Sequence, residues 1–156
     1  MSTPRIKHRV VSANVISTAC LHQHSLEFRK KSADGSAKCD IAHTGSPYDV
    51  VYGVLYEIQF ADKHILDQYE GLGNGYEAKH VPIILPDGKS IEANTYYATH
   101  IDTSLKPYHW YKEHVLRGAC EHALPDEHIA AIEAISSVAD PDCNKHIEEL
   151  SIYSNL

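Results

Sequence analysis

The sequence predicts an α+β fold, built as a single domain over residues 1–156, and three observations support this prediction. Segments rich in valine and tyrosine, with partial alternation of apolar and polar residues, fill the first two thirds, which is typical of strands. Apolar residues at helical spacing follow in the last third. The length suits one domain, and the 43% share of hydrophobic residues is enough for a proper core. Beyond about residue 136 the chain is only weakly patterned.

The expected strands lie between residues 10 and 98. Residues 10–28 predict two short strands or one bent strand, and residues 39–42 another short one. The clearest strand is 48–60, in which Gly53 predicts a bulge or a close backbone approach. Strands at 76–85 and 91–98 follow, and the turn between them contains Asp-Gly, a strong hairpin signal. Strands therefore come before most of the helical sequence, the order expected of an α+β protein.

Three helices are expected. The first begins after Asp62, which can cap it, and ends at Glu70 with Gly71 as its stop signal. Another covers residues 107–121. Pro125 fits the first turn of the last helix, which runs to about residue 135. No repeat or linker interrupts the chain, so all of these elements are assigned to one domain.

Glu70 is the strongest candidate for a chemical role. Leu66 lies four residues earlier and shares its helix face, so burial of Leu66 carries the carboxylate toward the interior. Partial burial, the negative end of the helix dipole and the nearby charge of Asp67 all disfavour the charged form. These effects predict a general base at Glu70. The local pattern alone also fits an exposed glutamate near a helix end.

Composition excludes several classes of protein. The net charge of −7 argues against a nucleic-acid partner, which favours a basic surface. No stretch reaches the roughly 18 apolar residues of a membrane span, and the start has no apolar signal-peptide core. Four scattered cysteines without a Cys-x-x-Cys pair are expected to be reduced thiols. We therefore expect a soluble, cytoplasmic protein that acts without a membrane.

Other motifs give little support for alternative chemistry. The 12 histidines include His22-x-His24, but none forms His-Glu-x-x-His and no cysteine cluster accompanies them, so no metal site is predicted. A metal protein remains the weakest alternative. Gly-x-Ser-x-Gly and Gly-x-x-x-x-Gly-Lys-Ser/Thr are both absent. The 10 tyrosines are compatible with core packing or with a pocket lining.

Five segments together carry a family resemblance. They are Arg5-Ile6-x-x-Arg9, the serine-rich turn at 32–36, the strand at 49–56, Leu66-Asp67-x-x-Glu70-Gly71 with Gly75-Tyr76, and Trp110-Tyr111-Lys112 with Arg117-Gly118-Ala119 and Leu124-Pro125. Each is weak alone, but their shared order from Arg5 to Pro125 is specific. In this respect the chain resembles the γ-glutamylcyclotransferase (AIG2-like) family.

The resemblance implies a small mixed β-barrel flanked by helices, with a cavity for a γ-glutamyl group. It implies cyclisation of that group to 5-oxoproline, with release of an amino acid or amine and without a cofactor. Glu70 corresponds to the catalytic general acid/base, and Tyr76, Tyr96 and Tyr111 correspond to substrate-binding residues. The sequence leaves the substrate open between a γ-glutamyl amino acid, a γ-glutamyl-lysine crosslink product and another γ-glutamylamine.

One departure from the family concerns the N-terminus. Members begin with a strand ending in Tyr-Gly-Ser-Asn, whose loop binds the glutamyl group, and this chain starts just after that motif. We expect a misassigned start and a longer native protein, because the rest of the site is intact. The alternative is a truncated, non-catalytic γ-glutamyl-binding module. Loss of a strand would leave an open edge and favour self-association into a homo-oligomer.

Overall fold

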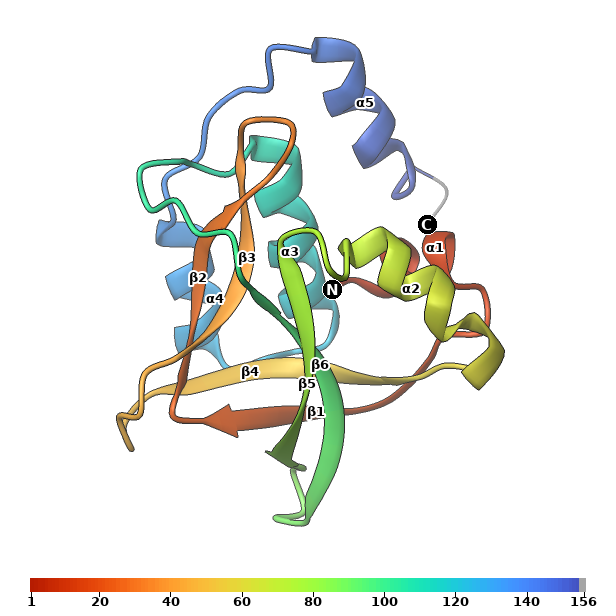
Figure 1. Cartoon of the computed structure of the whole chain (residues 1–156), viewed down its shortest axis with the longest axis vertical. Coiled ribbons are helices and arrows are strands. Elements are labelled where there is room, and N and C mark those ends of the chain that lie inside the picture. The colour runs from red at the N-terminus through yellow and green to blue at the C-terminus, as the bar shows by residue number, and fades with distance from the viewer. Residues whose placement is uncertain (155–156) are drawn as a thin grey trace.

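The structure is a computed structural model that describes residues 1–154. The helices and strands follow one another in the order α1 Thr3–Arg9, β1 Asn14–His22, β2 His24–Lys31, β3 Ala37–His43, β4 Val50–Glu57, the 3₁₀ turn η1 Phe60–Asp62, α2 Lys63–Glu70, β5 Tyr76–Ile84, β6 Ser90–Ala98, α3 His109–Glu121, α4 Asp126–Ala134 and α5 Cys143–Ser151. Helices α3 and α4 lie beside the β2–β3 ribbon, whereas α1 and α2 lie at the other side (Figure 1). The α+β class predicted from the sequence is confirmed.

Six antiparallel strands form two units. Four make a sheet in the order β4-β1-β5-β6, and β2 pairs with β3 as a separate ribbon. The segment after β6 joins the units, because Lys31 N–H donates to His100 O at 2.9 Å and Asp102 N–H donates to Arg29 O at 2.8 Å. Within residues 1–154 the strands thus form a four-stranded sheet and a two-stranded ribbon, and the small mixed β-barrel implied by the resemblance is not confirmed.

Residues 10–28 form two separate strands, one of the two expected arrangements. The prediction for Gly53 was wrong. Gly53 pairs with Ala19 in regular register, and the irregularity lies instead in β1 between Val15 and Ser17. No heavy atom lies within 4 Å of the place where a Cβ of Gly53 would be. Rather than meeting another backbone, Gly53 borders the cavities described below.

The sequence reasoning missed two short helices. The hydroxyl of Ser2 caps α1, and the Asp142 carboxylate caps α5 by accepting from the N–H groups of Asn144 and Lys145. These helices have only 7 and 9 residues, too few for a clear period. The segment beyond residue 136 is therefore more ordered than its weak pattern suggested.

Two expected helix starts also needed correction, although the helices themselves were anticipated. Pro125 precedes α4 as its N-cap residue instead of occupying its first turn. Asp62 does stand at the N-cap of α2, but its side chain makes no capping hydrogen bond. Its carboxylate accepts from the Ser12 hydroxyl at 2.5 Å. The end of α2 is as predicted, since Gly71 follows Glu70 in the left-handed conformation with φ 73°.

The apolar core is divided into three small clusters. One joins α1 to α2, one lies within the four-stranded sheet, and one lies between α3 and α4. Their buried members are Ile6, Val10 and Ala13; Leu21, Val81 and Ile83; and Ala119, Leu124 and Ile132. This division leaves room for the cavities between the clusters.

A polar network ties α5 and the N-terminal segment to α3. The Tyr153 hydroxyl lies 2.7 Å from Ser2 Oγ and 2.7 Å from Nδ1 of His114, which is 1% exposed. Glu149 Oε2 accepts from Arg5 Nη1 at 2.9 Å and lies 3.3 Å from His114 Nε2. In Figure 1, α5 stands at the top and its end returns toward α1. The two ends of the chain therefore share one set of hydrogen bonds.

We expect this network to make stability fall at acidic pH. Hydrogen bonds from His114 and Arg5 lower the pKa of Glu149 from 4.5 to about 2, so its contribution is present above 4.5 and is lost as the pH falls toward 2. Burial lowers the pKa of His114 below 6.5, so its neutral form contributes stability that is lost as the pH falls below 6.5. Urea unfolding between pH 7 and pH 3 measures both losses. In Glu149→Gln the loss below pH 4.5 should be smaller, and an unchanged pH profile would contradict this assignment.

Gly118 gives a second prediction, because α3 meets the N-terminal segment there. An added Cβ would lie 2.7 Å from Ser2 N and 2.8 Å from Met1 C, both backbone atoms. Alanine is favoured over glycine in a helix by about 1 kcal/mol, but this contact forces the backbone to move. We expect Gly118→Ala to lower the melting temperature. Cys120→Ala, at an exposed position of α3, is the control; a Gly118→Ala variant at least as stable as the wild type would refute the prediction.

Candidate active site

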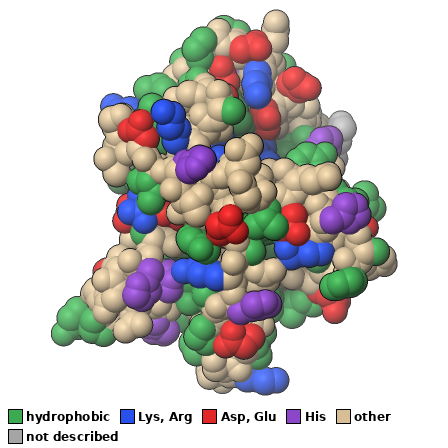
Figure 2. Space-filling view, in the orientation of Figure 1, with side chains coloured by type: hydrophobic (Ala, Val, Ile, Leu, Met, Phe, Trp, Pro, Cys, Tyr) green, Lys and Arg blue, Asp and Glu red, His purple; other side chains and the backbone are tan. Residues whose placement is uncertain are grey.

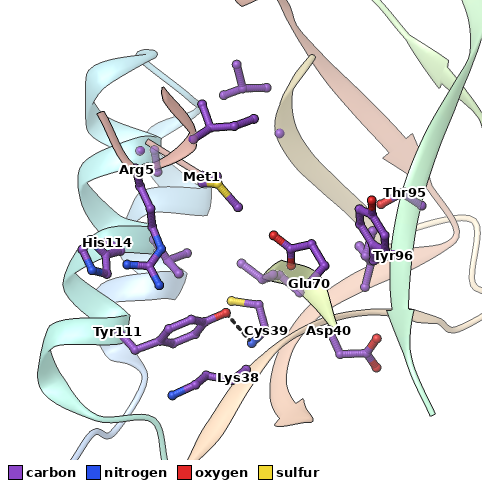
Figure 3. A pocket seen from close by; sticks show the side chains of 18 of the residues that line it. Met1, Arg5, Lys38, Cys39, Asp40, Glu70, Thr95, Tyr96, Tyr111 and His114 are labelled. Carbon is purple, nitrogen blue, oxygen red and sulfur yellow. Dashed lines mark hydrogen bonds between the residues drawn. The ribbon is translucent and has the colours of Figure 1, made fainter. Parts of the chain in front are cut away.

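A cavity of about 440 Å³ lies between the ribbon, the sheet and helices α1, α2 and α3. Figure 3 shows Glu70 near its centre, with Arg5 and Tyr111 on one side and Tyr96 on the other. A second cavity of about 450 Å³ shares Gly53, Leu66 and Tyr96 with the first and continues between β1, β4, β5 and β6. Each is within the usual range for small-molecule sites. The first is the candidate active site, because Glu70, Arg5 and Arg9 line it and do not line the second.

Glu70 reaches this cavity from the last turn of α2. Leu66, one turn earlier, is half-buried and packs against the cluster of Ile6, Val10 and Ala13. The side chain of Glu70 is 18% exposed and lines the cavity. The shared face expected for Leu66 and Glu70 is therefore observed.

The charges around Glu70 differ from those in the sequence argument. Arg9 Nη1 donates to Glu70 Oε1 at 3.0 Å, and this ion pair links the ends of α1 and α2. Asp67 is itself paired with the Lys63 ammonium. The like charge expected to act on Glu70 is thus partly neutralised, and the nearest charged partner of Glu70 is a guanidinium.

Tyr76 and Tyr111 hydrogen-bond the two backbone groups of one residue in β3, Cys39. The Cys39 N–H donates to Tyr111 Oη at 3.0 Å, and the Tyr76 hydroxyl donates to Cys39 O. Burial raises the pKa of both tyrosines, so both hydroxyls stay protonated at neutral pH. The pair fixes β3 against β5 and α3 and presents aromatic rings to the cavity.

Tyr96 lies on the opposite wall. Its hydroxyl donates to Asp67 Oδ1 at 2.6 Å and accepts from Lys63 Nζ at 3.1 Å. Burial and the hydrogen bond to Asp67 raise the pKa of Tyr96. The structure thus brings all four sequence-predicted site residues to one cavity. Their assignment as catalytic and substrate-binding stays a prediction.

Sequence reasoning assigned no role to several charged residues of the cavity wall. Arg5 and Arg9 are four apart and share a face of α1, a spacing that would have paired them had the helix been anticipated. Lys38 donates to Asp34 Oδ2 at 2.7 Å, and its ammonium lies 4.5 Å from the centre of the Trp110 ring. Asp40, 3% exposed, accepts from Ala98 N–H and from Arg29. No simple motif marks Lys38 or Asp40.

Cys39 lines the cavity, but its surroundings disfavour a thiolate nucleophile. Burial raises the pKa of the Cys39 thiol to about 12, so almost none of it is thiolate at neutral pH. Among residues 1–154, no group of three or more His, Cys, Asp or Glu side chains is arranged to hold a metal ion. Over the same residues, no helix has the length and apolar character needed to cross a membrane. Acidic and basic side chains are interspersed on the face shown in Figure 2.

An α+β domain with a carboxylate in the wall of a small-molecule cavity is a candidate small-molecule enzyme, and comparison with known proteins identifies its family. The AIG2-like family model matches residues 50–132. Human gamma-glutamylcyclotransferase is 31% identical over 140 residues, which cover 85% of this chain and 72% of the human protein. The bovine protein of the same name has the same identity and coverage. The chain therefore belongs to the AIG2-like family and is a relative of these gamma-glutamylcyclotransferases.

Solved structures agree with this membership. A gamma-glutamyl cyclotransferase is 25% identical with a TM-score of 0.85, and the match covers 98% of this chain and 92% of that one. The human protein loc79017 is 29% identical with a TM-score of 0.80, over 88% of this chain and 83% of that one. At 18% identity and a TM-score of 0.68, Bacillus subtilis YkqA supports the fold alone. The sequence resemblance did not cover the tail beyond about Ile135, whereas the first of these matches covers 98% of the chain.

Proposed function

We propose that this protein is a γ-glutamylcyclotransferase that converts a γ-glutamyl group into 5-oxoproline and releases an amino acid or amine. The observation that carries the proposal is the Glu70 carboxylate in the wall of a 440 Å³ cavity. Membership of the family and relatives named gamma-glutamylcyclotransferase add support. A small-molecule γ-glutamyl compound is accordingly the proposed substrate.

Glu70 would act as a general base and then as a general acid. The α-amine of the substrate is protonated at neutral pH and cannot attack until it loses a proton. Glu70 takes this proton, and the amine nitrogen attacks the γ-carbonyl carbon of the same molecule, forming the new C–N bond of a five-membered ring. Glu70 then gives this proton to the leaving nitrogen as the original C–N bond breaks. The second proton of the ring nitrogen passes through Glu70 to the released amine, so the products are the neutral lactam and an ammonium group, and Glu70 is a carboxylate again. Atoms and charges balance without a cofactor.

The cavity would contribute mainly by shaping the substrate. Because the reaction is intramolecular, folding the γ-glutamyl chain into a near-attack conformation supplies much of the rate enhancement. The rings of Tyr76, Tyr96 and Tyr111 border the space available for this folded conformation. Their hydroxyls are already bonded to Cys39 or Asp67 and hold the walls in place.

Release of 5-oxoproline from a panel of γ-glutamyl amino acids and γ-glutamylamines tests the proposal. We expect turnover of at least one member, with the amino acid or amine released in equal amount. Binding of γ-glutamyl compounds by calorimetry without any turnover would overturn the proposal and favour the non-catalytic binding module. Absence of both binding and turnover would refute both ideas.

A further inference from the structure

The Arg9–Glu70 ion pair is the feature of the cavity that the proposed reaction does not explain. Arg9 ends α1 and Glu70 ends α2, and their side chains are 16% and 18% exposed. A base held by a guanidinium is a weaker proton acceptor than a free one. The contact between Arg9 and Glu70 therefore has to be explained in a way that leaves Glu70 able to accept a proton from the substrate.

The contact between the two side chains leaves hydrogen-bonding capacity unused. Among residues 1–154, the Arg9 guanidinium donates only through Nη1, to Glu70 Oε1, and this carboxylate accepts from no other donor. No buried side-chain nitrogen or oxygen lacks a partner in this part of the chain, so their remaining polar atoms are accessible. A guanidinium has five N–H donors and commonly binds a carboxylate through two of them.

The position of Arg9 is fixed by its surroundings. Its guanidinium carbon lies 5.3 Å from the centre of the Tyr69 ring, a cation–π contact. Burial, and then the nearby charge of Arg5, lower the pKa of Arg9. Arg5 is engaged elsewhere, by Glu149 at 2.9 Å. A further anion beside Arg9 would be favourable.

The charged pairs beside Arg9 and Glu70 favour a ligand that is itself neutral overall. Arg5 is balanced by Glu149, Arg9 by Glu70, and Lys38 by Asp34. The head of a γ-glutamyl group carries an α-ammonium and an α-carboxylate on one carbon, side by side like the two members of the Arg9–Glu70 pair. Inserting this zwitterion would give each charge an opposite neighbour without adding net charge to a poorly solvated site.

From this geometry we infer that Arg9 is the anchor for the α-carboxylate of the γ-glutamyl substrate, and that Glu70 exchanges Arg9 for the substrate's α-ammonium on binding. The inference rests on the proposed function and adds a specificity-determining residue to it. The exchange places the Glu70 carboxylate next to the α-ammonium whose proton it must remove. The substrate's α-carboxylate then replaces Glu70 as the partner of Arg9. In the free protein, the contact with Arg9 holds the Glu70 side chain in position.

The test compares γ-glutamyl-alanine with its analogue in which the glutamyl α-carboxylate is a carboxamide. Loss of a charged hydrogen-bonded partner lowers kcat/KM by roughly 10- to 150-fold, so we expect the wild type to prefer the carboxylate by that factor. Arg9→Gln should reduce the preference to nearly 1, and Arg9→Lys should leave an intermediate value. Arg117→Gln, which removes an arginine from the exposed face of α3, is the matched control and should keep the preference.

Lys30 is the rival anchor, because it also lines the cavity, with its ammonium 4.9 Å from the centre of the Tyr76 ring. Loss of the preference in Lys30→Gln instead of Arg9→Gln would overturn the inference. So would equal turnover of the two substrates by the wild type, a comparison that does not depend on how any variant folds.

Calorimetry with the same two compounds separates this inference from the proposed function. A carboxylate preference in binding that disappears in Arg9→Gln would support the anchor even if no 5-oxoproline were released. Turnover with a preference unaffected by Arg9→Gln would reject the anchor and leave the proposed function standing.

Discussion

Glu70→Gln is expected to reduce 5-oxoproline release by about 10²- to 10⁴-fold, the usual contribution of a general acid–base residue. Glutamine has nearly the same shape and can still accept from Arg9 Nη1, which lies 3.0 Å from Oε1 in the wild type. The ion pair is lost but the hydrogen bond can remain, so the fold should be largely preserved. What disappears is the basic carboxylate needed to remove the proton from the α-amine. Steady-state kinetics on a turned-over γ-glutamyl compound measure the effect.

Glu77→Gln is the matched control, because Glu77 is exposed on β5. This substitution removes the same charge as Glu70→Gln, a short distance along the chain. It should retain wild-type activity. Full activity of Glu70→Gln, with the same pH profile as the wild type, would show that another group transfers the proton. Comparable losses in both variants would point to a general effect of charge.

Trp110→Ala is expected to be the most destabilising single substitution, by about 3–5 kcal/mol. Trp110 is 2% exposed, and its ring meets those of Tyr111 and His114 edge-on at centroid distances of 5.9 Å. The substitution leaves a cavity behind the wall that carries Tyr111. We therefore expect the midpoint of urea unfolding to fall markedly, with a rise in KM for any γ-glutamyl substrate.

Trp110→Phe separates packing from hydrogen bonding. It keeps an aromatic ring but loses the indole N–H that donates to Asp140 Oδ2 at 2.7 Å. Trp110→Phe should lower the free energy of unfolding by less than Trp110→Ala does, since most of the buried area is retained. An unfolding midpoint of Trp110→Ala equal to that of the wild type would contradict the role given to this side chain.

Local signals explain why much of the fold could be predicted. The Asp-Gly turn and the alternating segments around it predicted β5 and β6 correctly, and Gly71 predicted the end of α2. These features depend on residues close together in the sequence. The two terminal helices, α1 and α5, escaped prediction because they depend on caps and on tertiary contacts more than on a long apolar period.

The sequence by itself determined the α+β class, the position of Glu70 at the end of a helix and the family, because periodicity, turn residues and ordered motifs are local properties of the chain. Only the tertiary structure decided which groups meet Glu70. Arg9 is 61 residues away from it, and Tyr111 is 72 residues away from the Cys39 peptide that it holds. Such contacts depend on how α1, α2, β3 and α3 pack, because burial and folding bring these groups together without any fixed spacing in the sequence.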